Sequence, residues 1–270
     1  MVGQNKTEYR ESFFGGGSVG ISLLEKKPYV KSTWINNIDS SIAANWNGVL
    51  DITEKLKRSI LTNTLNKAAF ISFKEELRNK PAHLIKDVAF KKIACHRMSY
   101  SGLGTKGGAR KDFYSGWNLP TMCSEIDRLN HIFSIVNVKY KQCTSTDMIN
   151  LILNKSSLPC VIYLDPPYYL KGPALYQYPF ALHDHTRLSQ ALRLCKHKWL
   201  LSYDDGNEIR SLYAWAKIIE IPAQYSAGNK IKTSELLIPH IVYVNNKWYT
   251  IKFTVFVINF KFLPIEKVKY

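Results

Sequence analysis

The chain has 270 residues, enough for one substantial core and a smaller appended module. Lys and Arg outnumber Asp and Glu by 37 to 21, and the net charge of +16 is spread along the sequence, which favours a polyanionic partner such as nucleic acid. The five cysteines are widely spaced and form no Cys-x-x-Cys pair, so we expect neither a disulfide framework nor a metal site. No signal peptide is recognisable, and lysines interrupt the most apolar run, so we expect a cytoplasmic protein without a membrane span.

The amino-terminal stretch predicts two strand-to-helix units. YRESFF leads through glycines into the helix-like SVGISLLEKK, and STWINNID leads into SSIAANW. Strands that alternate with helices indicate a mostly parallel sheet covered on both faces. The first part of the chain is therefore predicted to be α/β.

The pattern changes between about residues 46 and 136. TEKLKRSILTNTL, AAFISFKEELRN and AHLIKDVAFKKIA are typical of successive amphipathic helices. The basic, glycine-rich MSYSGLGTKGGARKDFYSG follows, and it fits either a β-hairpin or a loop. We predict a mainly helical domain over residues 46–136, inserted into an α/β domain made of residues 1–45 and 137–270.

The carboxy-terminal half returns to alternation. Strands are predicted at 137–143, 160–165, 199–203 and 217–222, with helices at 148–155, 185–196 and 208–216 between them. SELLIPHIVYV and KWYTIKFTVFVINF can add an antiparallel edge. Together with the amino end, this order predicts one α/β sheet of the Rossmann-like type.

Glycines follow the first predicted strand. ESFFGGGSVG places Gly15, Gly16 and Gly17 before a helix that Ser18 can cap, where the backbone can closely approach a bound nucleoside. The alternative is a purely structural turn. At the end of the second strand, Asn37 or Asp39 is placed to hydrogen-bond a ribose, unless Asp39 simply caps the next helix.

The strand VIYL ends in Asp165-Pro166-Pro167-Tyr168. Its acid would lie at the carboxyl edge of a parallel sheet, where open α/β folds bind ligands, and the prolines remove two backbone donors from the turn. The Asp165 side chain and the Pro166 carbonyl would accept hydrogen bonds from an exocyclic amine while Tyr168 stacks on its ring. These four residues are the predicted catalytic group, which orients the amine toward an electrophile.

The order of these motifs resembles the Dam-like DNA adenine-N6 methyltransferases, in which an E-x-F-x-G-G-G turn, an inserted recognition module and DPPY follow one another. The resemblance covers about residues 8 to 240. It implies a Rossmann-like S-adenosylmethionine-dependent methyltransferase sheet with an inserted, mainly helical DNA-recognition module. The implied enzyme is a monomer that needs no metal and methylates adenine N6 in double-stranded DNA by base flipping, in a bacterial or phage-infected cell. The implied cofactor-binding residues are Glu11, Phe13, Phe14, Gly15, Gly17, Asn37, Asp39, Asp147, Met148 and Asp165.

The chain departs from the family pattern at its start. Only MVGQNKTE precedes the first strand, where the family has a lysine- and glycine-containing motif, and Ser12 replaces the usual proline. These departures leave open a truncated or decayed copy of the kind that occurs in integrated phage genomes. Two alternatives stay open: cytosine-N4 methylation, because the same acceptors serve any exocyclic amine, and a DNA-binding remnant that no longer catalyses.

The glycine-rich segment carries the candidate DNA contacts. Lys106, Arg110 and Lys111 suit phosphates, Tyr114 suits stacking or wedging, and Asn118 is suited to reading adenine. The alternative is a solvated basic loop.

Overall fold

The computed structural model describes residues 7–26, 30–138, 143–170, 172–224, 232–244 and 247–250. The strands are β1 Thr7–Glu11, β2 Val30–Ile35, β3 Asn137–Val138, β4 Cys160–Leu164, β5 Lys198–Asp204, β6 Ile219–Gln224, β7 Lys232–Pro239, β8 Ile241–Val244 and β9 Lys247–Thr250. The α-helices are α1 Ser18–Lys26, α2 Ser40–Asp51, α3 Thr53–Thr62, α4 Lys67–Asn79, α5 Val88–Met98, α6 Leu119–Ser134, α7 Met148–Leu153, α8 Gly172–Leu175, α9 Leu182–Leu194 and α10 Asn207–Leu212. Short 3-10 turns are η1 Ala82–Leu84, η2 Tyr100–Gly102, η3 Gly104–Lys106 and η4 Phe113–Gly116.

The described strands β1 to β7 form one sheet in the order β3-β2-β1-β4-β5-β7-β6, and β8 pairs with β9 in a separate ribbon. The pairs from β3 through β5 are parallel, whereas β7 runs antiparallel to both of its neighbours. The order 3-2-1-4-5 is that of the Rossmann fold, so the predicted fold class is confirmed. Its strand order reverses between β1 and β4, where such sheets form a ligand crevice.

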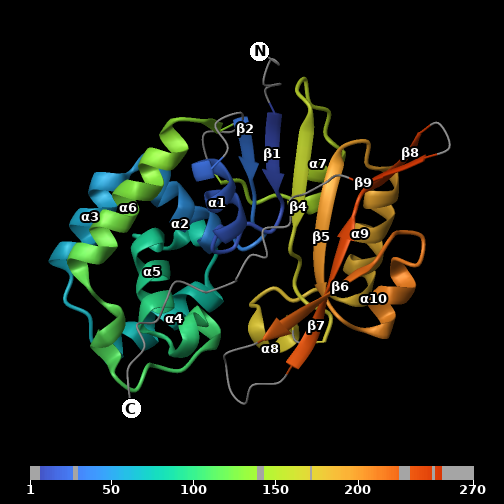
Figure 1. Cartoon of the computed structure of the whole chain (residues 1–270). Helices are drawn as coiled ribbons and strands as arrows, with labels where there is room; N and C mark the ends of the chain where they lie inside the picture. The colour runs from blue at the N-terminus through green and yellow to red at the C-terminus, as the bar shows by residue number, and fades with distance from the viewer. Residues whose placement is uncertain are drawn as a thin grey trace.

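Helices cover both faces of the sheet (Figure 1). On one face, α1 and parts of α2 and α6 pack on β1 and β2 through a core that includes Leu24, Trp46 and Phe133. On the other face, α7, α9 and α10 pack on β4 and β5. This arrangement buries both sides of β4, whose apolar run CVIYL has no polar alternation.

A helical group lies to one side of the sheet (Figure 1). Its own core joins α3, α4 and α5 with the far ends of α2 and α6. Within α2, Trp46 belongs to the sheet-side core and Val49 to the helical core. The predicted boundary at residue 46 therefore falls inside a continuous helix, and the division into domains stays a prediction.

Three local predictions need correction. The helix predicted over residues 82–94 is broken, because Asp87 adopts a left-handed conformation (φ 52°) between η1 and α5. Helix α6 was not predicted, although Asn118 and Pro120 are typical of a helix start. Strand β7 lies inside the sheet, between β5 and β6, instead of at its edge. Residues 251–270, part of the predicted edge, lie outside the described residues.

Candidate active site

Two acidic side chains meet where β1 and β4 end. Glu11 is in register with Tyr163, and Asp165 follows Tyr163 by two residues on the neighbouring strand. Side chains two residues apart along an extended chain point to the same face, so Glu11 and Asp165 share one face of the sheet. The sequence-predicted cofactor residue and the sequence-predicted catalytic residue are thus brought together.

Glu11 is almost completely buried, with 3% of its surface exposed. The Tyr9 hydroxyl donates to its Oε2 at 2.6 Å. A Cβ added to Gly20 would lie 2.7 Å from the same oxygen, so only glycine allows α1 to approach this carboxyl group. Burial, together with the nearby Asp165 charge, raises the pKa of Glu11 to about 8.

Asp165 is held by a side chain from the next strand. Ser202, which is buried in β5, donates its hydroxyl to Oδ1 of Asp165 at 3.0 Å. Burial and the charge of Glu235 raise the pKa of Asp165 to about 7, against the opposing effect of this hydrogen bond. Sequence reasoning missed Ser202, although a serine near the end of the apolar run WLLSY is a usable signal.

The glycine turn after β1 is tightly packed. Gly15 and Gly17 have positive φ angles of 48° and 70°, and a Cβ on Gly17 would lie 2.7 Å from the Phe14 ring. Phe14 is buried against Trp46 with their ring centroids 4.8 Å apart, whereas Phe13 packs on Phe180. Phe14 therefore supports the turn from the core, and the two glycines shape its backbone at the strand edge.

Asn36, which was not predicted, organises the end of β2. Its Nδ2 donates to the carbonyls of Ser12 and Thr146, at 3.2 and 3.0 Å. Its Oδ1 accepts from the Thr144 hydroxyl at 2.7 Å and from the Thr146 backbone N–H at 3.0 Å. One buried amide thus connects the glycine turn to the segment that precedes α7.

Replacing Asn36 with alanine should lower the free energy of unfolding by about 2 to 3 kcal/mol, because several buried polar groups lose their partner together. Urea unfolding followed by tryptophan fluorescence would measure this change. Asn37→Ala is the matched control, because the Asn37 side chain accepts a local hydrogen bond from the Asp39 backbone N–H. Equal losses in the two variants would contradict the role assigned to Asn36.

The two predicted ribose contacts are engaged within the protein. Asp39 caps α2 by accepting from the Ser41 N–H at 2.9 Å, and its second oxygen forms an ion pair with Lys92 of α5 at 2.8 Å. The capping alternative is therefore observed for Asp39. A ribose contact by Asn37 or Asp39 stays a prediction, and for Asp39 it would have to compete with Lys92.

Asp147 and Met148 begin α7 beside the end of β2. Asp147 caps the helix through Oδ1, which accepts from the Ile149 N–H at 2.8 Å, and its Oδ2 pairs with Arg187 of α9 at 2.8 Å. Met148 is buried in the core beneath. The parallel bridge between Asn36 and Thr144 sets this segment next to the strand ends.

The glycine-rich segment is a compact loop closed by one antiparallel bridge between Ser99 and Ala109. Lys74 and Arg78 of α4 donate to its carbonyls at Gly107 and Thr105. The Thr105 hydroxyl donates to Gln177, in the segment that follows the catalytic motif, at 2.8 Å. The loop is thereby fastened both to the helical group and to the sheet side of the molecule.

The predicted DNA-contacting side chains differ in exposure and in hydrogen bonding within the protein. Lys106, Lys111 and Tyr114 are exposed. Arg110 is half-buried and donates to the Arg97 carbonyl at 3.4 Å. The Asn118 side chain caps α6 by accepting from the Thr121 N–H at 3.0 Å, so its oxygen is engaged, and base reading by this residue stays a prediction.

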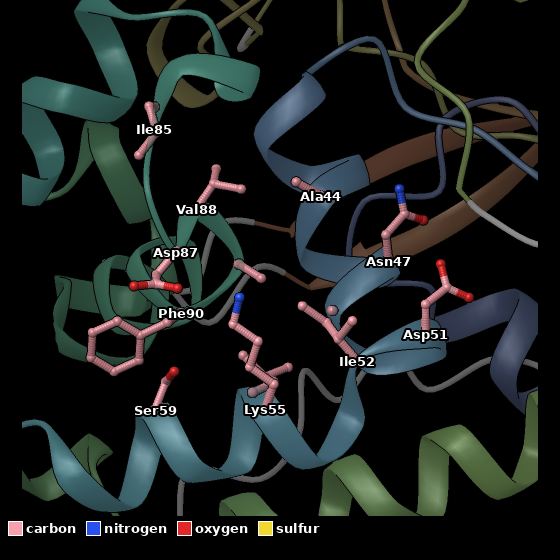
Figure 2. Close-up of a pocket in the computed structure, with 13 residues that line it drawn as sticks. Ala44, Asn47, Asp51, Ile52, Lys55, Ser59, Ile85, Asp87, Val88 and Phe90 are labelled. Atoms are coloured by element: carbon pink, nitrogen blue, oxygen red, sulfur yellow. The ribbon is translucent and has the colours of Figure 1, made fainter.

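A separate pocket of about 360 Å³ lies in the helical group. Figure 2 shows that Ala44 and Asn47 of α2, Lys55 and Ser59 of α3 and the segment from Ile85 to Phe90 surround it. Lys55 reaches from α3 into this space. None of its lining residues belongs to the strand ends or to the predicted sites.

The described residues contain no helix long and apolar enough to cross a bilayer. In the same part of the chain, no group of three or more His, Cys, Asp or Glu side chains is arranged to hold a metal ion.

Comparison with known proteins gives one family match. The family model of the D12 class N6 adenine-specific DNA methyltransferases matches residues 2–227. Among solved structures, the chain is similar to the rRNA methyltransferase aviRa from Streptomyces viridochromogenes, with 11% identity and a TM-score of 0.37, over 88% of this chain and 78% of that one. A search of curated proteins found no match.

Proposed function

The chain belongs to the D12 class N6 adenine-specific DNA methyltransferase family, and we propose from the geometry of its strand ends how it carries out this reaction. The methyl donor is S-adenosylmethionine, the substrate is double-stranded DNA, and the target adenine is rotated out of the duplex before transfer. The proposal rests on one observation: Glu11 and Asp165 lie close together at the ends of β1 and β4, beside the glycine turn.

The strand ends fit this cofactor. Two buried carboxyl groups whose pKa values lie near neutrality attract a cation, and the cofactor has cationic ammonium and sulfonium groups. Gly15 and Gly17 leave the backbone of the turn without side chains on the path of the ligand. We propose that Glu11, Asp165 and the glycine turn hold the methionine part, and that Asp147 and Met148 flank the adenine.

The proposed catalytic residues act on the target amine by positioning it. The side chain of Asp165 or the carbonyl of Pro166 accepts hydrogen bonds from the amine N–H groups, while the Tyr168 ring stacks on the base. When bound, S-adenosylmethionine supplies an electrophilic methyl group on a sulfonium sulfur. Held in this way, the amine would accept this methyl group from the sulfonium, which would become a neutral thioether, and would give up one proton to solvent water. The chain contributes orientation and electrostatics to this step.

We propose that the glycine-rich loop faces the duplex. Exposed Lys106 and Lys111 would neutralise phosphates, and exposed Tyr114 would contact bases or fill the space left by the flipped adenine. Support comes from the net charge of +16 and from the hydrogen bond between Thr105 and Gln177, which connects this loop to the segment after Asp165-Pro166-Pro167-Tyr168.

The direct test is transfer of labelled methyl from S-adenosylmethionine to unmethylated DNA, followed by digestion and mass spectrometry of the nucleosides. N6-methyladenine is the expected product. N4-methylcytosine would overturn the choice of base. Folded wild-type protein that binds DNA but forms no methylated product would show a binding remnant instead.

Cofactor affinity should rise with pH. The pKa values of Asp165, about 7, and of Glu11, about 8, lie above the ordinary range, so both groups are partly protonated near neutrality. A cationic ligand favours the ionised carboxylates, so binding should release protons and tighten between about pH 6 and about pH 8.5. The stability of the cofactor-free protein should change with pH in the opposite direction. Because both carboxyl groups have raised pKa values in the folded protein, they favour the fold at low pH, and this contribution is lost as the pH rises through 7 to 8.

Calorimetry of S-adenosylmethionine binding in buffers of different ionisation enthalpy would measure both the affinity and the proton release. Asp165→Asn should release fewer protons than the wild type. A dissociation constant that does not change with pH, with no proton release, would contradict this prediction.

A further inference from the structure

Two carboxylates from neighbouring strands hold the segment that contains the proposed stacking tyrosine. Asp204 is the last residue of β5, and Glu235 lies directly opposite it in the antiparallel strand β7. We propose that Asp204 and Glu235 are positioning residues that fix, respectively, the backbone after Tyr168 and the ring of Tyr168 for base stacking. This inference rests on the proposed function.

Asp204 holds the backbone of the turn. Its Oδ1 accepts from the Tyr169 N–H at 2.9 Å, and its Oδ2 accepts from the Leu170 N–H at 2.8 Å. Only 4% of Asp204 is exposed, so these two charge-assisted hydrogen bonds compensate much of the cost of burying its charge. Because both oxygens are used on consecutive amides, the peptide after Tyr168 has one preferred orientation.

Glu235 acts on the side chain of the same turn. The Tyr168 hydroxyl donates to Oε1 of Glu235 at 3.2 Å. A tyrosine side chain moves about two torsions, and a tether at its hydroxyl restricts the first of them, χ1, which swings the whole ring. With Asp204 holding the backbone and Glu235 holding the hydroxyl, the position of the Tyr168 ring is restrained at both ends.

Neighbouring aromatic side chains support this turn from the core. The Tyr169 ring packs edge-on against His185, with their centroids 5.2 Å apart, and His185 is hydrogen-bonded to the Tyr203 hydroxyl at 2.6 Å. Tyr203 directly precedes Asp204, so β5 contributes both this support and the carboxylate. Displacement of a reacting group by about 1 Å can cost roughly 100-fold in rate, which makes such bracing matter for catalysis.

The test compares methyl-transfer kinetics on unmethylated genomic DNA. Asp204→Asn should lower kcat roughly 10- to 100-fold, because the asparagine amide group places a donor against a backbone N–H of the turn. The dissociation constants for cofactor and for DNA should stay near those of the wild type. Asp205→Asn is the matched control, because the carboxylate of Asp205 binds Arg210 and Ser234 instead of the turn. An unchanged kcat in Asp204→Asn, or an equal loss in the control, would overturn the role of Asp204.

A double-mutant cycle tests Glu235 through Tyr168. Glu235→Ala should lower kcat about tenfold in the wild type and have little further effect when Tyr168→Phe has already removed the hydroxyl. Glu235→Gln keeps an acceptor oxygen and should retain most of the activity. Equal effects of Glu235→Ala in both backgrounds would show that Glu235 does not act through the tyrosine hydroxyl.

Hydrogen exchange gives a readout that does not depend on activity. The amides of Tyr169 and Leu170 should exchange slowly in the wild type and at least about tenfold faster in Asp204→Asn, but not in Asp205→Asn. A wild type without methyl transfer to any DNA would overturn the proposed function. Hydrogen exchange would still show, without any methyl transfer, whether Asp204 holds the turn. Exchange rates at Tyr169 and Leu170 that do not change in Asp204→Asn would overturn the role of Asp204.

Discussion

Replacing Asp165 with alanine should reduce methyl transfer by at least roughly 100- to 1,000-fold, the range found when a preorganised polar group is removed from an active site. Asp165 is proposed to interact with both the target amine and the positive charge of the cofactor, so kcat and cofactor affinity should both fall. Single-turnover kinetics with labelled S-adenosylmethionine would measure the first effect, and calorimetry the second.

The fold should survive this change. Asp165 lies past the end of β4 and is partly exposed, and its side-chain partner Ser202 can keep its hydrogen bond to the Leu164 carbonyl. Removing an acid whose pKa is raised by desolvation should also slightly stabilise the free protein above neutral pH. Asp51→Asn, an exposed acid at the end of α2, is the control and should keep full activity. Wild-type kinetics in Asp165→Ala would exclude the proposed mechanism.

Replacing Arg10 with methionine should lower the free energy of unfolding by about 3 to 5 kcal/mol, the usual cost of breaking a buried ion pair from one side. The Arg10 side chain is completely buried and pairs with Glu8 at 2.6 Å. Its guanidinium also donates to the carbonyls of Leu151, Asn154 and Lys155, at 2.6, 2.7 and 3.2 Å. The variant would remove the cation that faces the buried Glu8 carboxylate and the donor of the buried Leu151 carbonyl.

Urea unfolding followed by tryptophan fluorescence would measure this loss. Arg58→Met on the exposed side of α3 is the control and should change stability by no more than about 0.5 kcal/mol. Adding Glu8→Leu to Arg10→Met should recover part of the loss, because no unpaired charge then remains. An Arg10→Met variant as stable as the control would show that Arg10 does not hold the turn after α7 in place.

Local patterns in the sequence were sufficient to predict the sheet and to propose where the site lies on it. Apolar runs alternating with helical periodicity predicted the α/β architecture, because burial on both faces of a parallel sheet leaves a recognisable signature. The glycine turn and Asp165-Pro166-Pro167-Tyr168 were readable because turns depend on residue types that tolerate positive φ or lack an N–H. Helix α6 was missed despite its start signals, so pattern reading alone was incomplete even for local structure.

The tertiary structure decided which polar residues cooperate. Two candidates, Asn37 and Asp39, were predicted at the end of β2, yet the buried hub is Asn36, while Asp39 caps α2 and pairs with Lys92. The partners of the catalytic motif come from strands far along the chain: Ser202 and Asp204 from β5 and Glu235 from β7. Sequence spacing does not show which residues contact the motif, because the order of strands in the sheet decides which strand ends are neighbours. Here β7 lies between β5 and β6. The sequence by itself therefore determined the fold class and predicted a chemistry for the Asp165-Pro166-Pro167-Tyr168 motif, and only the packing of distant strands decided what holds that motif in position.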